Sequence, residues 1–200
     1  FLFSFISSIY LFSAGTLFYF KKKVENSDIF LSVFLGAFIL SVLSLFLNFF
    51  IPLNININNF IFIFIILFGL ITVLKKKNLF RLIKYFFLIS LISTLILSFD
   101  TIYRPDANLY HLPYTKIINE NKIIFGIANI HFRFGHISVL QYLNAIFNNS
   151  LFSEKGILIP AAILFSSTIL YFYKEIIQNI DKNKIYSYYV FLLLASIFLG

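Results

Sequence analysis

Residues 29–51 read IFLSVFLGAFILSVLSLFLNFFI, a run without a charged side chain. The hydrocarbon core of a bilayer is about 30 Å thick, so a helix needs roughly 17–25 apolar residues to cross it. This stretch is therefore predicted to be a membrane-spanning helix. The rest of the chain has the same character, because 60% of its 200 residues are hydrophobic, 12% are charged and the mean hydropathy is +0.92. These values indicate a polytopic membrane protein and exclude an ordinary soluble domain.

Further apolar stretches of suitable length occur on both sides of this run. They cover residues 1–20, 59–74, 82–99, 157–173 and 185–200. The apolar stretch 136–147 is too short to cross a bilayer and is predicted to lie in the interface or to re-enter. The predicted fold is all-α, a polytopic transmembrane helix bundle with an external loop that carries an amphipathic juxtamembrane helix. Its predicted parts are four transmembrane helices in 1–99, the external loop in 100–156 and two further transmembrane helices in 157–200.

The two ends of the chain also carry information. The chain begins with Phe1, ends at Gly200 inside an apolar run and contains no methionine. We therefore expect it to be a fragment of a longer protein. It contains no cysteine either, so neither a disulfide framework nor thiolate chemistry is available in these 200 residues.

Charge placement predicts the orientation. The segments after the first, third and fifth predicted spans hold eleven of the sixteen basic residues but only four of the eight acidic ones. Cytoplasmic loops of membrane proteins carry an excess of lysine and arginine. We therefore expect these segments to be cytoplasmic, and the loop 100–156 to face the periplasm or exterior of a bacterial inner membrane. The net charge of +8 is then a topology signal. Nucleic acid is not an expected partner, since that would need a basic face on a folded domain.

The external loop holds most of the chemically competent side chains. Residues 100–136 read DTIYRPDANLYHLPYTKIINENKIIFGIANIHFRFGH and include all three histidines and two of the three arginines. Ionisable groups in a membrane protein are costly to desolvate and tend to persist where they have a function. A site is therefore predicted in this loop. Residues 113–122 mix apolar and polar side chains in a pattern typical of a helix that lies along the membrane surface.

Part of this loop resembles a known family. The segment DANLYHLPY (residues 106–114), followed by a surface helix, resembles the first outward loop of GT-C-type membrane glycosyltransferases. Together with GIANIHFRFG (residues 126–135), it is similar to a group of bacterial multipass proteins that carry a YHLP…GxANxHxRFG loop. The chain departs from the GT-C pattern in two ways. Ala107 follows Asp106 where an Asp-Glu pair is common, and about four predicted spans precede the loop instead of one.

The resemblance implies transfer of a sugar from a polyprenyl-phosphate donor to an envelope glycan, lipid or protein. Inverting transfer needs a carboxylate that takes the acceptor's proton. Asp106 is the first candidate for this base and Asp100 the second, and His111 completes the catalytic candidates. No cofactor is expected with certainty. A divalent metal ion remains an alternative, because carboxylates and an imidazole suit manganese-like ions.

The departing lipid phosphate needs positive charge and hydrogen-bond donors. The planar guanidinium of Arg133 can contact a phosphate at two points, and His111 or His131 can donate a hydrogen bond. The remaining substrate-binding candidates are Tyr110, Arg104 and Lys116. The expected partners are membrane lipids and the lipid-linked sugar.

Plainer interpretations stay open beside this one. The carboxylates also suit helix ends, the arginines and histidines suit anchors for phospholipid headgroups, and the tyrosines suit an interfacial aromatic belt. At the level of the whole protein, the alternatives are a transporter or flippase subunit and a non-catalytic multipass protein. Transporters usually carry ionisable residues or broken helices near the membrane midplane, and the predicted spans here carry almost none.

Overall fold

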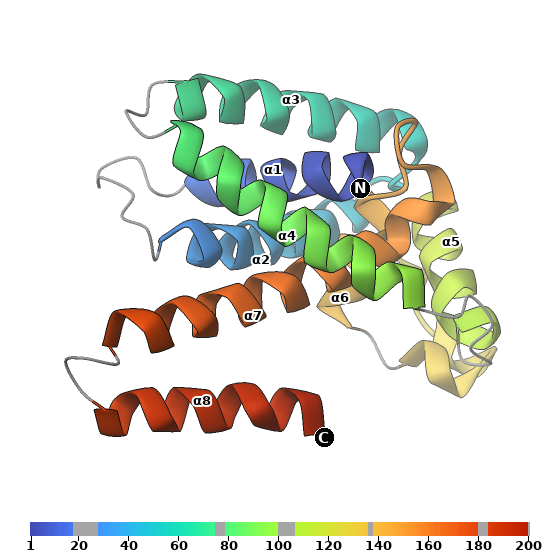
Figure 1. Ribbon diagram of the computed structural model, residues 1–200. Helices are drawn as coiled ribbons and strands as arrows, with labels where there is room; N and C mark the ends of the chain where they lie inside the picture. The colour runs from blue at the N-terminus through green and yellow to red at the C-terminus, as the bar shows by residue number, and fades with distance from the viewer. Residues whose placement is uncertain (18–27, 75–78, 100–106, 136–137, 180–183, 200) are drawn as a thin grey trace.

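The computed structural model describes residues 1–17, 28–74, 79–99, 107–135, 138–179 and 184–199 (Figure 1). Within these ranges every regular element is helical, which confirms the all-α class. The long helices are α1 (Leu2–Thr16), α2 (Asp28–Asn48), α3 (Ile55–Leu74), α4 (Leu79–Phe99), α7 (Ile159–Asn179) and α8 (Lys184–Leu199). The short elements are η1 (Ala107–His111), α5 (Leu112–Glu120), η2 (Ile127–Asn129), η3 (Phe132–Gly135), α6 (Val139–Ile146) and η4 (Ser153–Leu158).

Three of the described helical stretches are long and apolar enough to cross a membrane: Ile29–Asn48, Leu79–Phe99 and Ser153–Gln178. The last of these runs from η4 into α7. The apolar helices Leu2–Thr16 and Ile55–Ile71 are shorter. The chain is therefore a helical membrane protein. The helix within the apolar stretch 136–147 is α6, whose 8 residues fall well below the roughly 17 that a crossing needs.

Successive long helices run in alternating directions across the bundle. In Figure 1, α1, α3 and α7 end at the left of the bundle, where α2, α4 and α8 begin. These are the helix ends that adjoin the basic segments of the sequence. The elements α5 and α6 lie at the opposite end. The fold thus separates the helix ends that adjoin the basic segments from α5 and α6, which belong to the part of the chain in which the site was predicted.

Helix α1 is the centre of the bundle, in contact with α2, α3, α4 and α7. Its residues 10–16 are all buried. The contact with α2 is close because Gly15 and Gly36 bring the two backbones together: a Cβ atom on Gly15 would overlap the carbonyl oxygen of Ser32, and one on Gly36 that of Leu11. Lipid tails are as apolar as the helices, so close packing of small residues, rather than a hydrophobic driving force, holds such helices together.

Replacing Gly36 with alanine is predicted to destabilise the bundle. Alanine is favoured over glycine inside a helix by about 1 kcal/mol, but here its Cβ would overlap the carbonyl oxygen of Leu11. We expect the clash to prevail and to lower the free energy of unfolding by about 1–3 kcal/mol. Thermal unfolding of the purified protein in lipid nanodiscs measures this. Gly135→Ala is the control, since its Cβ would lie 3.2 Å from the Cβ of Ala128, a contact that a shift of a few tenths of an ångström relieves. Equal melting temperatures for the two variants would contradict the close contact.

Candidate functional site

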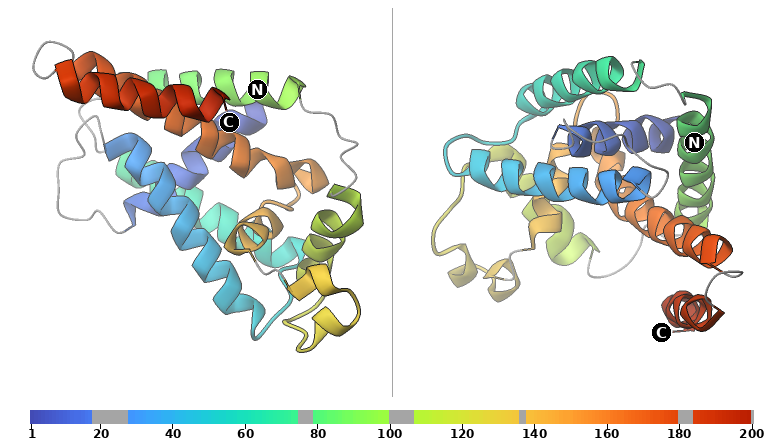
Figure 2. Two further views of the ribbon diagram at one scale, coloured as in Figure 1. Left: turned by 90° about the horizontal axis from the view of Figure 1, so that it is seen from below. Right: turned by 90° about the vertical axis from the view of Figure 1, so that its left-hand side faces the viewer.

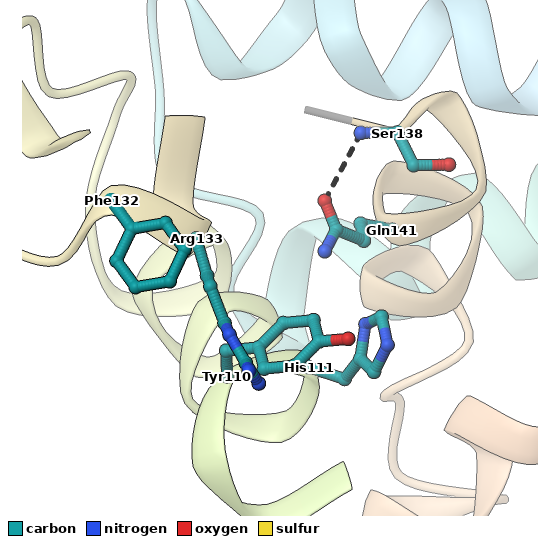
Figure 3. Close-up of a pocket in the computed structure, with 6 residues that line it drawn as sticks. All are labelled: Tyr110, His111, Phe132, Arg133, Ser138 and Gln141. Atoms are coloured by element: carbon teal, nitrogen blue, oxygen red, sulfur yellow. Dashed lines mark hydrogen bonds between the residues drawn. The ribbon is translucent and has the colours of Figure 1, made fainter. Parts of the chain in front are cut away.

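The structure brings three of the predicted site residues together. Tyr110, His111 and Arg133 line one pocket with a volume of about 400 Å³ (Figure 3). Its other lining residues are Phe132, Ser138 and Gln141. The walls come from η1, η3 and the beginning of α6, three elements that are separated in the sequence.

The cation of the pocket lies against aromatic rings. The Cζ atom of Arg133 is 4.9 Å from the centroid of the Tyr110 ring and 5.7 Å from that of Phe132. Figure 3 shows the guanidinium reaching from η3 to the Tyr110 ring. The rings of Tyr110 and His111 are 4.2 Å apart. Cation–π contacts of this kind stabilise the position of the guanidinium, whose N–H groups are of the type that binds anions.

A wide helical turn presents the first wall. Residues 107–111 form a π-helical turn that leads directly into α5. Such turns interrupt a regular helix and are frequent at functional sites. The hydroxyl of Thr115 donates to the carbonyl oxygen of His111 over 2.9 Å, which satisfies one of the carbonyls at this junction. Tyr110 and His111 are thereby placed at the start of a helix rather than on a free loop.

The third wall is fixed by a helix cap. Ser138 precedes α6, its hydroxyl accepts from the Leu140 N–H, and its own N–H donates to Oε1 of Gln141 over 3.2 Å. This reciprocal arrangement is a capping box. Gln141 is only 6% exposed. Because its oxygen is engaged by the cap, its amide NH₂ group is directed to the pocket side (Figure 3). Gln141 was not among the predicted site residues, although the spacing Ser-x-x-Gln signals such a cap in the sequence.

Two predicted binding residues lie elsewhere. Nδ1 of His131 accepts from the backbone N–H of Arg133 over 3.3 Å, and its ring packs between Phe132 and Phe134. It therefore shapes the turn that carries Arg133 and does not line the pocket. Lys116 forms an ion pair with Glu120 at 3.8 Å, and the two side chains are 71% and 61% exposed. Such an exposed i,i+4 pair contributes little to stability.

The remaining predicted residues, Asp100, Arg104, Asp106 and also His136, lie outside the described residues. The two carboxylates proposed as base, and with them the alternative metal site formed with His111, are therefore not part of the described pocket. Within the described ranges, no group of three or more His, Cys, Asp or Glu side chains is arranged to hold a metal ion.

Asparagine side chains fasten the site to the bundle. Nδ2 of Asn48, at the end of α2, donates to the carbonyl oxygens of Ile118 and Asn121 over 3.2 and 2.9 Å. The amide groups of Asn58 on α3 and Asn119 on α5 share two acceptors, the carbonyl oxygens of Leu53 and Ala145. These four bonds are 2.7–3.0 Å long. They join the α2–α3 turn, α5 and the end of α6 in one buried joint.

An apolar cluster fills the space beside this joint. Its buried members are Leu53, Tyr114, Ile118, Ile127, Tyr142 and Ala145. Burial raises the pKa of Tyr142 above its ordinary value, and a hydrogen bond with Tyr114 raises it further. Tyr142 therefore stays protonated across the physiological pH range. The cluster gives the pocket a rigid, uncharged support.

The fold and the site together define the class of this protein. It is an all-α membrane protein with a cationic, aromatic pocket at one end of its helix bundle. The chain belongs to the family described as domain of unknown function DUF8201, which matches residues 1–200. No curated protein and no solved structure matches the chain.

The shared acceptors generate a prediction about stability. With Asn58→Leu or Asn119→Leu alone, the Leu53 carbonyl keeps one side-chain donor, and the Ala145 carbonyl keeps one in addition to the backbone N–H of Asn148. In the double variant the Leu53 carbonyl loses both of its side-chain donors, whereas the Ala145 carbonyl keeps the Asn148 N–H at 3.2 Å, and a buried unpaired polar group costs about 1–3 kcal/mol. We therefore expect the two substitutions together to lower the free energy of unfolding by about 1 kcal/mol more than the sum of the singles.

Thermal unfolding of the four proteins of this double-mutant cycle in nanodiscs tests the coupling. Asn56→Leu is the control, because Asn56 is exposed on the same helix as Asn58. Strictly additive effects would show that the two amides do not act on common acceptors.

Proposed function

We propose that this protein is a GT-C-like membrane glycosyltransferase. In this proposal it moves a sugar from a polyprenyl-phosphate donor to an envelope glycan, lipid or protein on the outer side of a bacterial inner membrane. The observation that carries the proposal is the pocket in which Arg133, His111 and Gln141 bring a cation, an imidazole and an amide donor together beside aromatic rings.

The chemistry of the pocket suits a phosphorylated headgroup. Arginine is the residue best matched to phosphate, because its planar guanidinium donates two parallel hydrogen bonds to two phosphate oxygens. The Cζ atom of Arg133 lies over the Tyr110 ring, and this cation–π contact stabilises the position of the guanidinium in the pocket. A volume of about 400 Å³ lies in the range of pockets that enclose small molecules, about 300–1,000 Å³. A sugar phosphate fits this space, and a lipid tail would remain outside it.

The position of the pocket favours a lipid-linked donor over a soluble one. The pocket lies at the end of the bundle opposite the helix ends that adjoin the basic segments. If those segments are cytoplasmic, as the charge bias favours, the pocket opens outward. Soluble nucleotide sugars are cytoplasmic, so a donor used on the outer side has to be carried there on a lipid.

The proposed base is Asp106, with Asp100 as the second candidate. Asp106 directly precedes the turn that carries Tyr110 and His111 in the sequence. In an inverting reaction this carboxylate takes the proton of the acceptor hydroxyl while that oxygen bonds to the anomeric carbon. The bond from the anomeric carbon to the lipid phosphate breaks, and Arg133 and His111 stabilise the departing phosphate.

The alternative class, a transporter or flippase subunit, has less support. Transporters place ionisable groups near the midplane of the membrane. Among the described residues the only buried charged side chain is Lys174, at 8% exposure, and it lies near the C-terminal end of α7 rather than at its middle.

Arg133→Lys is predicted to weaken donor binding although it keeps the charge. Lysine cannot make the planar two-point contact, and a hydrogen bond to a charged group contributes about 1.5–3 kcal/mol, so we expect a loss of about tenfold or more in affinity. The measurement is binding of a polyprenyl-phosphate sugar to the full-length protein in nanodiscs. Arg81→Lys is the matched control, because Arg81 lies on α4 near the opposite end of the bundle. Equal affinity of R133K and wild type, or no binding by the wild type, would remove the proposed donor.

Asp106→Asn is predicted to stop transfer without stopping binding. The substitution keeps the volume of the side chain and removes the base, which lowers the transfer rate by roughly 10²–10⁴-fold. Formation of glycosylated product from a labelled lipid-linked donor in membranes measures the rate, and the protein level checks insertion. The control is Glu154→Gln, an exposed carboxylate on η4. An unchanged rate in D106N would reduce Asp106 to a carboxylate at a helix end.

A further inference from the structure

The loop between α5 and α6, residues 121–135, exposes large apolar side chains. Ile124, Phe125, Ile130 and Phe132 are 43, 86, 78 and 68% exposed. In the same loop Ile127 is buried and packs in the cluster of Tyr114 and Tyr142, so the loop is anchored by one apolar residue while it presents four others outward. Several large apolar side chains exposed on one loop mark a region of contact with a membrane or another protein.

The loop lies at the level where a predicted span ends. The N–H of Ile123 donates to the carbonyl oxygen of Asn48, the last residue of α2, over 2.9 Å. Phe46, in the last turn of α2, and Phe50, two residues beyond its end, are themselves 59% and 67% exposed. Figure 2 (left) shows the loop beside this end of α2. The apolar surface of a helix able to cross the membrane therefore continues into the loop, at the depth where the bilayer interface lies.

The charge of the loop complements lipid headgroups. Residues 121–135 contain Lys122, Arg133 and His131 but no acidic residue. Basic side chains that flank exposed aromatic and aliphatic ones are typical of segments lying in the membrane interface. There the apolar groups insert and the cations meet lipid phosphates.

The backbone of the loop is suited to that layer. The N–H groups of Asn129, Ile130 and Phe134 donate to the carbonyl oxygens of Gly126, Ile127 and His131 over 2.9–3.0 Å. Gly126 begins this series of turns with φ = 78°, a left-handed conformation that glycine adopts without strain. Internal bonding lowers the cost of moving the backbone out of water. Irregular backbone does not enter the hydrocarbon core, however, so this loop is suited to the headgroup layer and not to the core.

We infer that the loop inserts its exposed apolar side chains, those of Ile124, Phe125, Ile130 and Phe132, into the headgroup layer of the lipid bilayer. This seats the pocket at the membrane surface, because Phe132 belongs both to the inserted set and to the pocket lining. Only the identity of the headgroup that reaches the pocket rests on the proposed function. The insertion itself does not depend on any reaction.

The 200 residues contain no tryptophan, which makes the inference directly testable. Phe125→Trp and Ile130→Trp each add a reporter to the full-length protein, reconstituted in nanodiscs of phosphatidylcholine and phosphatidylglycerol. We expect their added emission, relative to the unsubstituted protein, to be quenched by brominated lipid and protected from aqueous iodide. Phe64→Trp on α3, at a residue 61% exposed, is the lipid-facing control. Glu120→Trp, at the exposed end of α5, is the aqueous control.

Two outcomes would overturn the inference. Quenching of both loop reporters by iodide but not by brominated lipid would place the loop in water. Protection from both quenchers would mean that protein, not lipid, covers it. Binding of the polyprenyl-phosphate sugar, measured on the same nanodiscs, is a separate result, so failure of the proposed donor and failure of loop insertion are distinguishable.

Discussion

The site depends on a small set of buried hydrogen bonds between asparagine side chains and backbone carbonyls. Helix and turn ends leave carbonyl oxygens without partners, and such a group costs free energy when it is buried. Asn58 and Asn119 satisfy the same two carbonyls from different helices, and Asn148 donates to Oδ1 of Asn119 over 3.0 Å. An amide can serve several acceptors at once only in one geometry. The joint therefore fixes how α5 and α6 sit on the α2–α3 turn, and with it the distance between the walls of the pocket.

The interior of the bundle, away from this joint, is stabilised by close packing. It holds small and hydroxylated residues, including Ser7, Ser8 and Ser13 on the central helix α1, all at 0% exposure. Small residues let helices approach closely without large side chains to interlock. Serine hydroxyls also bond within their own helix, as Ser8 does to the carbonyl oxygen of Phe5. Among the described residues, asparagine side chains make long-range hydrogen bonds at the end of the bundle that carries the site, and these bonds fix its geometry.

Hydropathy predicts the long helices, because crossing a bilayer demands length and apolar character that are visible in any short window. The apolar run 29–51 matches α2, although the helix ends at Asn48, whose amide turns to partners in α5 and beyond. These partners lie 70 or more residues away in the sequence, so no local sequence pattern predicts the hydrogen bonds. The close contact of Gly15 with α2 is similar, since two isolated glycines on separate helices form no motif.

The site was predictable to the extent that composition reveals it. Tyr110, His111 and Arg133 attract notice because polar and aromatic groups gather in one segment between apolar spans, and the structure brings these three together. Composition does not tell which polar residue points where. The His131 ring accepts a hydrogen bond within its own turn and does not line the pocket. Gln141 lies in an apolar segment and was not predicted as a site residue, but the cap of α6 orients its side chain toward the pocket.

The position of Arg133 connects the joint, the pocket and the membrane surface. Its neighbour Phe132 is 68% exposed beside the inserted loop, whereas the Arg133 guanidinium lies over the Tyr110 ring. At a bilayer interface the effective dielectric constant is lower than in bulk water, so an arginine–phosphate contact is stronger there than on a fully solvated loop. In the proposed arrangement, a phosphate carried on a lipid is already held at the depth of this cation, whereas a soluble anion has to reach it from bulk water. The proposed function therefore predicts a preference for ligands anchored in lipid that needs no contact with the lipid tail.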